Sequence, residues 1–380
     1  MLTSILEKQL KELKQRHRYR ERVVLPKDII DFSSNDYLGL KDNLYTKRKL
    51  CENILSLSLG SGASQLVSGY KDIQKELETF LANFKETEEC LVVGSGYLAN
   101  TGLVQALTTE EDVIFSDELN HASIIDGVRL SKAKKVIYKH NDINDLEDKL
   151  KKNPSKRLSF IITDGVFSME GDIANVKDII FLAEKYGAVV IMDDAHSTGI
   201  LGEGKGTLFH FGLKPSENII QMGTLSKAVG SYGAFICGSK VLIEYLINKM
   251  RTAIFSTALS PVQNFISLEN LKLIVNQPER RKDVLEKSKY VAQKLKDIGY
   301  NIHFFGTPIL SLILGEDKKA LDLRDKLLKK GIFIQAIRPP TVPEGTARLR
   351  ITLSFNHTKN QIEKLIKTFD NLYREVISHE

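Results

Sequence analysis

Short, continuous runs of hydrophobic residues alternate with longer amphipathic stretches from about residue 90 to residue 240. Continuous runs are typical of strands buried on both faces of a mostly parallel sheet, whereas strands with one exposed face alternate. The amphipathic stretches between them, such as 176–186, have the spacing of crossover helices. The runs lie at 90–93, 113–115, 136–138, 160–162, 188–192 and 234–237. The pattern therefore predicts an α/β fold in which helices cover both faces of a mostly parallel sheet.

The pattern changes after the last of these runs. Helical spacing dominates from 239 to 298, where Pro261 suits the first turn of a helix. The remaining expected strands and helices alternate and lie at 309–314, 317–330, 332–334, 349–353 and 358–378. This arrangement predicts a smaller α+β domain at the C-terminus. We expect three parts: 1–45, which begins with an amphipathic helix over 1–18, a large domain over 46–280, and a small domain over 281–380.

Composition and charge exclude several classes of protein. Hydrophobic residues make up 42% of the chain and charged residues 27%, which excludes a disordered or collagen-like chain. The 54 basic and 48 acidic residues leave a net charge of only +6, spread in short runs, so no nucleic-acid partner is expected. The three cysteines form no C-x-x-C pair, so neither a metal site nor a disulfide framework is expected.

The N-terminus becomes charged at Glu7, too early for the apolar core of a signal peptide. The longest apolar runs are far shorter than the ~18 residues of a membrane span. We therefore expect a soluble, cytoplasmic protein with no membrane partner.

Polar residues follow the expected strands at their carboxyl ends, where open α/β sheets bind ligands. After 90–93 comes Gly94-Ser95-Gly96-Tyr97, a turn whose backbone N–H groups and following helix suit an anion, although a plain tight turn has the same pattern. The turn does not match G-x-G-x-x-G, so a dinucleotide site is not indicated. After 113–115 comes His121, which suits either a structural role at a helix start or a functional one.

The most informative residues follow 188–192. Asp193 and Asp194 stand at the end of a buried strand, where a carboxylate is costly unless a positive charge lies nearby, and His196 follows closely. A helix cap would account for Asp194 alone. Lys227 lies between small residues after a further apolar run; it suits a surface position or, if desolvated, an amine that forms Schiff bases.

The order of these groups changes their interpretation. Along the chain come a glycine turn with an aromatic residue, a histidine, a serine, Asp-x-x-His and Ser-x-Lys, each after a strand. Pyridoxal phosphate (PLP) requires such a set: a carboxylate for its pyridine nitrogen, a lysine for an imine and a turn for its phosphate.

The chain resembles the α-oxoamine synthases, PLP enzymes of the aspartate-aminotransferase fold, over about 16–355. The motifs that carry the resemblance are Phe32–Leu40 (FSSNDYLGL), Leu66–Tyr70 (LVSGY), Asn120–Ser123 (NHAS), Asp193–Gly199 (DDAHSTG), Thr224–Lys227 (TLSK) and Arg338–Pro343 (RPPTVP). The DDAH motif and the stretch Arg338–Arg350 are most similar to members that act in biotin synthesis. These condense L-alanine with a pimeloyl thioester, carried on CoA or on a carrier protein, and release carbon dioxide and the free thiol.

The resemblance also implies roles for single residues. Lys227 forms the internal aldimine with PLP and later moves the α-proton, and Asp193 keeps the pyridine nitrogen protonated. His121 stacks on the ring and contacts substrate, and His196 contacts the phenolic oxygen. The other implied cofactor-binding residues are Gly96, Tyr97, Ser168, Thr224 and Thr257. The implied substrate-binding residues, beside His121, are Arg16, Asn35, Thr341 and Arg350.

By the same resemblance, residues 46–280 form the PLP-binding domain and 1–45 contact substrate. Thr257 lies in a segment that reaches the phosphate of a neighbouring subunit, so a homodimer is implied. Three residues depart from the pattern of the family: Gln65 and Lys205 stand where arginine is usual, and Ser197 replaces a glycine.

Three alternatives remain open at this point. A glycine C-acetyltransferase, which makes 2-amino-3-oxobutyrate from acetyl-CoA, would use the same machinery with glycine. A nicotinamide-dependent reductase would use Tyr245 and Lys249, which fit the Tyr-x-x-x-Lys pattern, although no dinucleotide fingerprint accompanies them. A catalytically silent relative would be expected to lack Lys227 or Asp193, and both are present.

Overall fold

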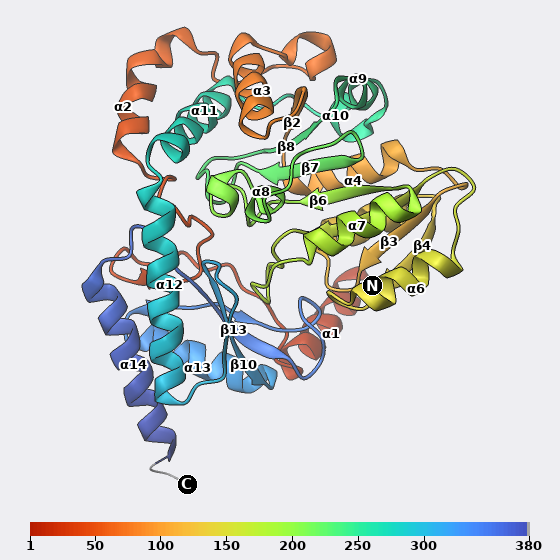
Figure 1. Cartoon of the computed structure of the whole chain (residues 1–380). Coiled ribbons are helices and arrows are strands. Elements are labelled where there is room, and N and C mark those ends of the chain that lie inside the picture. The colour runs from red at the N-terminus through yellow and green to blue at the C-terminus, as the bar shows by residue number, and fades with distance from the viewer. Residues whose placement is uncertain (378–380) are drawn as a thin grey trace. The chain divides into compact units, whose positions relative to one another are not determined.

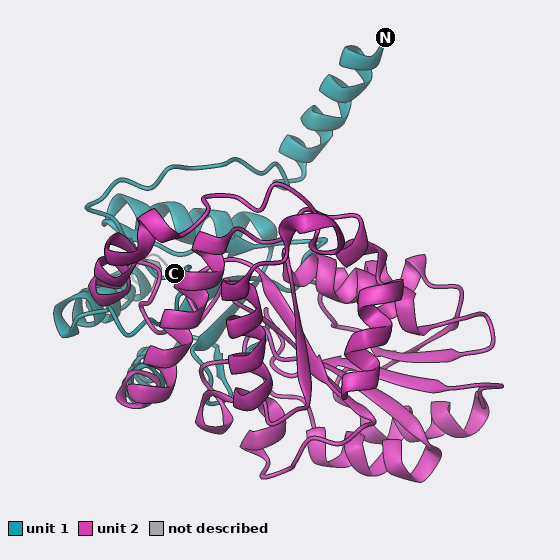
Figure 2. Cartoon of the chain, turned by 90° about the horizontal axis from the view of Figure 1, so that it is seen from above, with its two compact units in different colours: residues 1–37, 169–172, 282–380 teal, residues 38–168, 173–281 magenta. Residues whose placement is uncertain are grey.

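The computed structural model describes residues 1–377. The chain forms two units, drawn in two colours in Figure 2. Unit 1 contains Met1–Tyr37, Met169–Asp172 and the described chain from Lys282 onward, and unit 2 contains Leu38–Ser168 and Ile173–Arg281. The expected division into 1–45, 46–280 and 281–380 stays a prediction. The separate substrate-contacting role of residues 1–45 stays a prediction.

A seven-stranded sheet forms the centre of unit 2 (Figure 1), in the order β2-β8-β7-β6-β5-β3-β4. The pairs from β4 across to β7 are parallel, and β8 is antiparallel to both of its neighbours. The strands are β2 (Glu89–Val93), β3 (Val113–Asp117), β4 (Lys134–Tyr138), β5 (Ser159–Asp164), β6 (Ala188–Asp193), β7 (Ile219–Thr224) and β8 (Ala234–Gly238). The predicted mostly parallel sheet is confirmed.

Helices cover this sheet on both faces, as the continuous hydrophobic runs require. The helices of unit 2 are α2 (Leu44–Asn53), α3 (Asp72–Phe84), α4 (Gly96–Leu107), α5 (Ala122–Leu130), α6 (Ile143–Lys152), α7 (Val176–Tyr186), α8 (Thr207–His210), α9 (Lys240–Lys249), α10 (Arg251–Ile254) and α11 (Pro261–Asn276). Short helical turns lie at Ile54–Ser56, Gln65–Gly69 and Gly202–Gly204. Successive residues of β5 belong to different hydrophobic cores on the two faces of the sheet. Phe160 and Ile162 pack with α4 and α5, and Ile161 packs with α6 and α7. Strands buried on both faces cannot alternate with polar residues, which explains the pattern in the sequence.

Unit 1 joins the two ends of the chain. Its four-stranded antiparallel sheet has the order β12-β13-β10-β9, and the short β1 pairs in parallel with β11. The strands are β1 (Ile30–Asp31), β9 (Ile302–Phe304), β10 (Ile309–Gly315), β11 (Ile332–Phe333), β12 (Ala336–Ile337) and β13 (Ala347–Thr352). The helices are α1 (Leu2–Gln15), α12 (Glu279–Ile298, which begins in unit 2), α13 (Asp317–Lys329) and α14 (Lys359–Ile377). The α+β character predicted for the C-terminal part is confirmed.

Among residues 1–377, no helix is both long enough and apolar enough to cross a bilayer.

Candidate active site

The carboxyl ends of β5, β6 and β7 place four of the predicted residues at or just beyond one edge of the sheet in unit 2. Asp193 is the last residue of β6, and Thr224 is the last residue of β7. Asp164 ends β5 and is the direct neighbour of Asp193 in the parallel register. Lys227 follows β7 by three residues, and Ser168 follows β5 by four. Consecutive parallel strands thus bring residues far apart in sequence to one edge.

Asp193 is held by two hydrogen bonds. It is 3% exposed. Its Oδ2 accepts a hydrogen bond from Asn100 Nδ2 at 2.7 Å, and its Oδ1 accepts one from the Ala195 N–H at 2.8 Å. A carboxylate has about four acceptor positions, so this arrangement fixes the group and leaves capacity for a further donor.

A chain of hydrogen bonds joins Asp193 to His121. Asn100 Nδ2 also donates to Ser123 Oγ at 2.9 Å, and Ser123 Oγ lies 2.8 Å from His121 Nδ1. Nδ1 accepts from the Ser123 N–H, so the imidazole caps the start of α5. Asn100, on α4, is a site residue that sequence reasoning missed. Its only signal is an amide in the middle of a helix that follows the glycine turn.

His121 is a neutral imidazole in this setting. Burial lowers its pKa, the negative charge of Asp193 acts in the opposite direction, and the positive charge of Lys227 lowers the pKa further. Asp193 and Lys227 each lie close enough to His121 for their charges to act on its pKa. The three residues that carry the most chemistry in the predicted site are therefore brought together.

Asp164 is a second buried carboxyl beside this group, and sequence reasoning did not single it out. Its Oδ2 accepts the His121 backbone N–H at 2.7 Å. Burial and the neighbouring charge of Asp193 raise its pKa well above the usual value, against the opposing effects of this hydrogen bond and of Lys227. Two carboxyl groups at adjacent strand ends resist ionising together, so Asp164 is the one that favours the protonated form.

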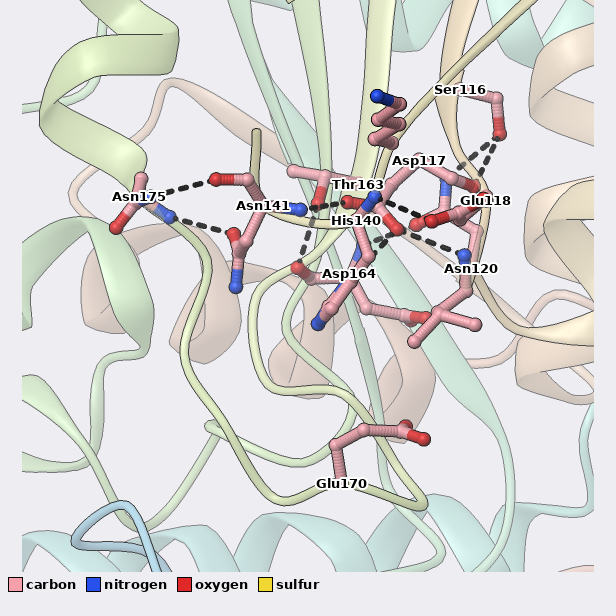
Figure 3. Close-up of polar contacts among 12 residues, drawn as sticks. Ser116, Asp117, Glu118, Asn120, His140, Asn141, Thr163, Asp164, Glu170 and Asn175 are labelled. Carbon is pink, nitrogen blue, oxygen red and sulfur yellow. Dashed lines mark hydrogen bonds and ion pairs between the residues drawn. The ribbon is translucent and has the colours of Figure 1, made fainter. Parts of the chain in front are cut away.

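Asn120 and Asp117 hold the loop that carries His121 (Figure 3). Asn120 Nδ2 donates to the Ile162 carbonyl at 2.8 Å, and its Oδ1 accepts the Asp164 N–H at 2.9 Å. Asp117, at the end of β3, accepts the Leu119 N–H of this loop at 2.9 Å and also accepts from His140 Nδ1 at 3.0 Å. In the NHAS motif, Asn120 therefore fixes the loop to β5, and this positions the neighbouring His121.

The glycine turn after β2 lies against the end of β7. A Cβ at Gly96 would lie 2.7 Å from Thr224 Cγ2, so only glycine allows this approach. Ser95 caps α4 by accepting the Leu98 N–H at 3.2 Å. Tyr97 is partly exposed, and its hydroxyl donates to the Asp126 carboxylate. The Thr224 methyl group faces Gly96, while the Thr224 hydroxyl donates to the Ala195 carbonyl at 3.4 Å. A helix start with backbone N–H groups at a glycine turn suits an anion.

The loop after β6 is anchored by a buried ion pair. Lys85 Nζ lies 2.8 Å from Asp194 Oδ2, and both side chains are 0% exposed. Asp194 Oδ1 accepts from the Thr207 N–H and hydroxyl at 3.0 and 2.7 Å and from Ser197 Oγ at 2.5 Å. These bonds close the segment 194–207, which contains the buried His196.

The three departures from the family pattern all have partners within the chain. Ser197 donates to Asp194 as described above. Lys205 Nζ pairs with Glu86 at 2.5 Å, and Gln65 Nε2 donates to the Val92 carbonyl at 2.8 Å.

Thr257 lies beside this last segment. It forms an isolated antiparallel bridge with Ser64, the residue before Gln65. The next residue, Ala258, donates its N–H to the Ala63 carbonyl at 3.0 Å. The expected reach of Thr257 to a neighbouring subunit stays a prediction.

Two predicted substrate residues meet in unit 1. Arg350, on β13, is 5% exposed and donates to Asn35 Oδ1 at 2.8 Å and to Thr352 Oγ1 at 3.1 Å. Its Nη2 lies 3.3 Å from the Tyr37 hydroxyl, a contact that sequence reasoning did not identify although Tyr37 lies in the FSSNDYLGL motif. Burial raises the pKa of Tyr37, so the residue stays a neutral phenol.

The other two substrate candidates lie elsewhere in unit 1. Thr341 Oγ1 accepts from Arg20 at 3.3 Å. Arg16 is exposed at the C-terminal end of α1, where its backbone N–H bonds to the Glu12 carbonyl. The described hydrogen bonds therefore join Arg350 to Asn35 and connect Thr341 to Arg20.

The residues of unit 2 fit PLP. Asp193 is fixed and buried where a pyridine nitrogen could donate to it, and Lys227 is close enough to influence the pKa of the neutral His121 ring. The turn at Gly96 provides a cradle that a Cβ would fill. PLP requires these groups: a carboxylate for its pyridine nitrogen, an amine for its aldehyde, a flat ring against its own ring and a turn that binds its phosphate.

Comparison with known proteins identifies close relatives. The family model described as aminotransferase class I and II matches residues 27–369. The 8-amino-7-oxononanoate synthase of Lysinibacillus sphaericus is 46% identical over 357 residues, covering 94% of this chain and 92% of the relative.

Solved structures give the same result. The crystal structure of 8-amino-7-oxononanoate synthase from Francisella tularensis matches with a TM-score of 0.80 and 29% identity, covering 93% of this chain and 100% of that one. A structure of SPT with a PLP internal aldimine matches with a TM-score of 0.88 and 28% identity, covering 92% and 88% of the two chains. These findings confirm the fold and the family resemblance predicted from the motifs.

Proposed function

Because this chain belongs to the aminotransferase class I and II family, we propose that it is a PLP-dependent acyltransferase. The reaction condenses L-alanine with a pimeloyl thioester to form 8-amino-7-oxononanoate, with release of carbon dioxide and the free thiol. The relative of that name is 46% identical over nearly the whole chain, which supports this choice of substrates. The single observation that carries the proposal is the convergence of Lys227, Asp193 and His121 at one edge of the sheet.

Bound PLP supplies an electron sink that stabilises negative charge on the α-carbon of the amino acid. The chain's own residues then have separate tasks. Lys227 would hold the cofactor through its amine and would accept the α-proton of the amino acid. Asp193 keeps the pyridine nitrogen protonated, and the Asn100 bond holds its carboxylate in place. His121 would cover one face of the ring and would add little positive charge, because burial lowers its pKa.

The remaining cofactor contacts are assigned from the positions of the residues around the sheet edge. We assign the phosphate to the turn at Gly96 and Tyr97 and to Thr224, whose methyl group lies against Gly96. Ser168 and His196 complete the set, His196 at the phenolic oxygen. Each assignment is tested by the cofactor dissociation constant of the single variant.

Arg350 is the proposed anchor for the carboxylate of alanine. A planar guanidinium binds a carboxylate through two parallel hydrogen bonds. Asn35 holds one side of the guanidinium at 2.8 Å, which orients it before substrate arrives. Arg16 and Thr341 are assigned to the acyl substrate.

The test of the reaction is thiol release from pimeloyl-CoA. We expect release with alanine and little or none with glycine. Release with glycine, above all when acetyl-CoA replaces pimeloyl-CoA, would instead identify a glycine C-acetyltransferase. Pimeloyl-carrier protein in a parallel assay distinguishes the two forms of the donor.

The test of the site is Lys227→Ala. The variant is expected to lose both turnover and the visible absorbance of lysine-bound cofactor. Lys249→Ala is the matched control, because Lys249 is exposed on α9 and belongs to the Tyr-x-x-x-Lys pattern of the reductase alternative. Normal turnover in Lys227→Ala, or its loss in Lys249→Ala, would contradict the assignment.

The proposal includes a cytoplasmic homodimer in which Thr257 contacts the cofactor phosphate of the other subunit. Sedimentation measurements test the dimer. Mixing Thr257→Ala with an inactive Lys227→Ala partner tests the shared contact, because a residue that acts across the interface gives partial complementation.

A further inference from the structure

Unit 1 contains a cavity of about 560 Å³ that the proposed active site does not use. Its walls come from the end of α1 and the segment that follows, from α13, and from the stretch around β11 and β12. The lining residues are Lys14, His17, Tyr19, Arg20, Glu21, Val23, Leu321, Arg324, Asp325, Leu328, Phe333, Gln335 and Arg338. Cavities of 300–1,000 Å³ are typical of small-molecule sites.

The charges in this lining are unbalanced. Four of the lining residues are cationic and only two are acidic, which leaves an excess of two positive charges. One acidic residue, Asp325, is already paired with the adjacent Arg324 at 2.7 Å. The basic side chains therefore meet around a space that holds too few negative charges to neutralise them.

Arg338 is the most informative of these residues. It is 6% exposed, and its two terminal nitrogens donate to backbone carbonyls, those of His17 and Tyr19, and not to a carboxylate. Its Nε is buried and has no hydrogen-bond partner among the described residues. A buried guanidinium with no carboxylate bound to it in the described part of the chain, and with its Nε–H unpaired, is costly unless a ligand compensates it.

The neighbours of Arg338 make its position less favourable. Burial lowers the pKa of Arg338, and the positive charges of Arg324 and Arg20 lower it further, with Asp317 opposing them. Asp317 is already bound by Arg18 at 3.1 Å. Like charges that converge in this way are stabilised when an anion lies between them.

The rest of the lining indicates what else the ligand carries. Val23, Leu321, Leu328 and Phe333 are apolar, and Tyr19 adds an aromatic ring. A bare inorganic anion would leave these side chains without a partner. A ligand with both phosphate groups and a flat organic ring matches the two parts of the lining.

We propose that this cavity binds the phosphate groups of a nucleotide, with Arg338, Arg324 and Arg20 as the phosphate ligands. The nucleotide has two possible sources that share this chemistry. One is the nucleotide end of a CoA-linked acyl donor, which rests on the proposed function; the other is a free nucleotide that binds independently of the reaction.

The test is direct binding by calorimetry, with no amino acid and no turnover, so its result does not depend on the proposed reaction. The probes are adenosine 3′,5′-bisphosphate, AMP and inorganic phosphate, added to the PLP-loaded protein. Arg324→Gln is the main variant, and Lys319→Gln is its control. The control substitution also removes one positive charge from α13, but Lys319 does not line the cavity. Arg338→Gln is included with a circular dichroism check of folding.

We expect Arg324→Gln to weaken nucleotide binding about tenfold, as for one lost charge-assisted contact, and Lys319→Gln to leave it unchanged. Two results together would assign the site to the CoA donor. The protein would bind the bisphosphate more tightly than AMP, and Arg324→Gln would raise the KM for pimeloyl-CoA without changing kcat. Equal binding of both nucleotides assigns it to a free nucleotide. No binding at millimolar concentration, or equal binding by Arg324→Gln and Lys319→Gln, would overturn the proposal.

Discussion

Replacing Lys85 by methionine should strongly destabilise unit 2. Lys85 Nζ and Asp194 Oδ2 are 2.8 Å apart, and both side chains are completely buried. At that distance the attraction is about 6 kcal/mol for an effective dielectric constant of about 20, and the loss of hydration offsets much of it. Methionine fills a similar volume but leaves the Asp194 carboxylate buried without its cation. Removal of one partner of such a pair costs about 3–5 kcal/mol.

The chain contains a matched control for this experiment. Lys47 and Asp42 are also 2.8 Å apart, but their side chains are 55% and 66% exposed. Exposed pairs contribute about 0–1 kcal/mol, so Lys47→Met should have little effect. The assay is urea unfolding followed by far-UV circular dichroism, since the chain has no tryptophan. A loss in Lys85→Met below about 1 kcal/mol, or equal to that in Lys47→Met, would refute the reasoning.

The same pair makes a prediction about pH. Burial tends to raise the pKa of Asp194, but the charge of Lys85 and the hydrogen bonds from Lys85, Ser197 and Thr207 together lower it below the usual value. A carboxyl group with a lowered folded pKa contributes stability above its unfolded pKa of about 3.9 and loses it as the pH falls through the folded value. Wild type should therefore lose this contribution in strong acid, and Lys85→Met should have less to lose. Equal losses in both proteins would contradict this account.

Two further substitutions test the sheet edge. Gly223→Ala should destabilise by about 1–3 kcal/mol, because its Cβ would lie 2.4 Å from Phe235 Cζ in the core, whereas Gly60→Ala, with no atom within 4 Å, should change urea unfolding little. Asp164→Asn should gain stability relative to wild type as the pH rises from acid to neutral. The pKa of Asp164 is raised, by burial and then by Asp193, so its stabilising contribution is complete below its unfolded pKa and is lost as the pH rises through the folded value. Parallel pH profiles of thermal unfolding for the two proteins would contradict this.

The central strands and their site residues were predictable because both depend on local patterns. A strand buried on both faces must be continuously hydrophobic, and polar residues directly after it must lie at the carboxyl edge. Asp193 and His121 could be placed from this argument alone. The antiparallel direction of β8 could not, because a short hydrophobic run has the same composition in either direction.

Other features had no local signal. Asn35 and Arg350 are separated by 315 residues, and their hydrogen bond depends on the pairing of the N-terminal segment with the last strands. Lys85 resembles a surface lysine at the end of a helix, and only the fold shows that Asp194 neutralises it in the core. Asn100 has the same character, because an amide in a helix becomes informative only when its partners are known.

The position of β2 at the end of the sheet has a consequence for synthesis of the chain. Its one neighbour in the sheet is β8, which leaves the ribosome about 145 residues later. At about 5–20 residues per second, β2 waits about 7–30 s for its partner. During that time its hydrophobic side chains and unpaired backbone are exposed to other nascent chains. The turn at Gly96 directly follows β2, so the backbone that would bind the anion is fixed in the sheet only after β8 has been made.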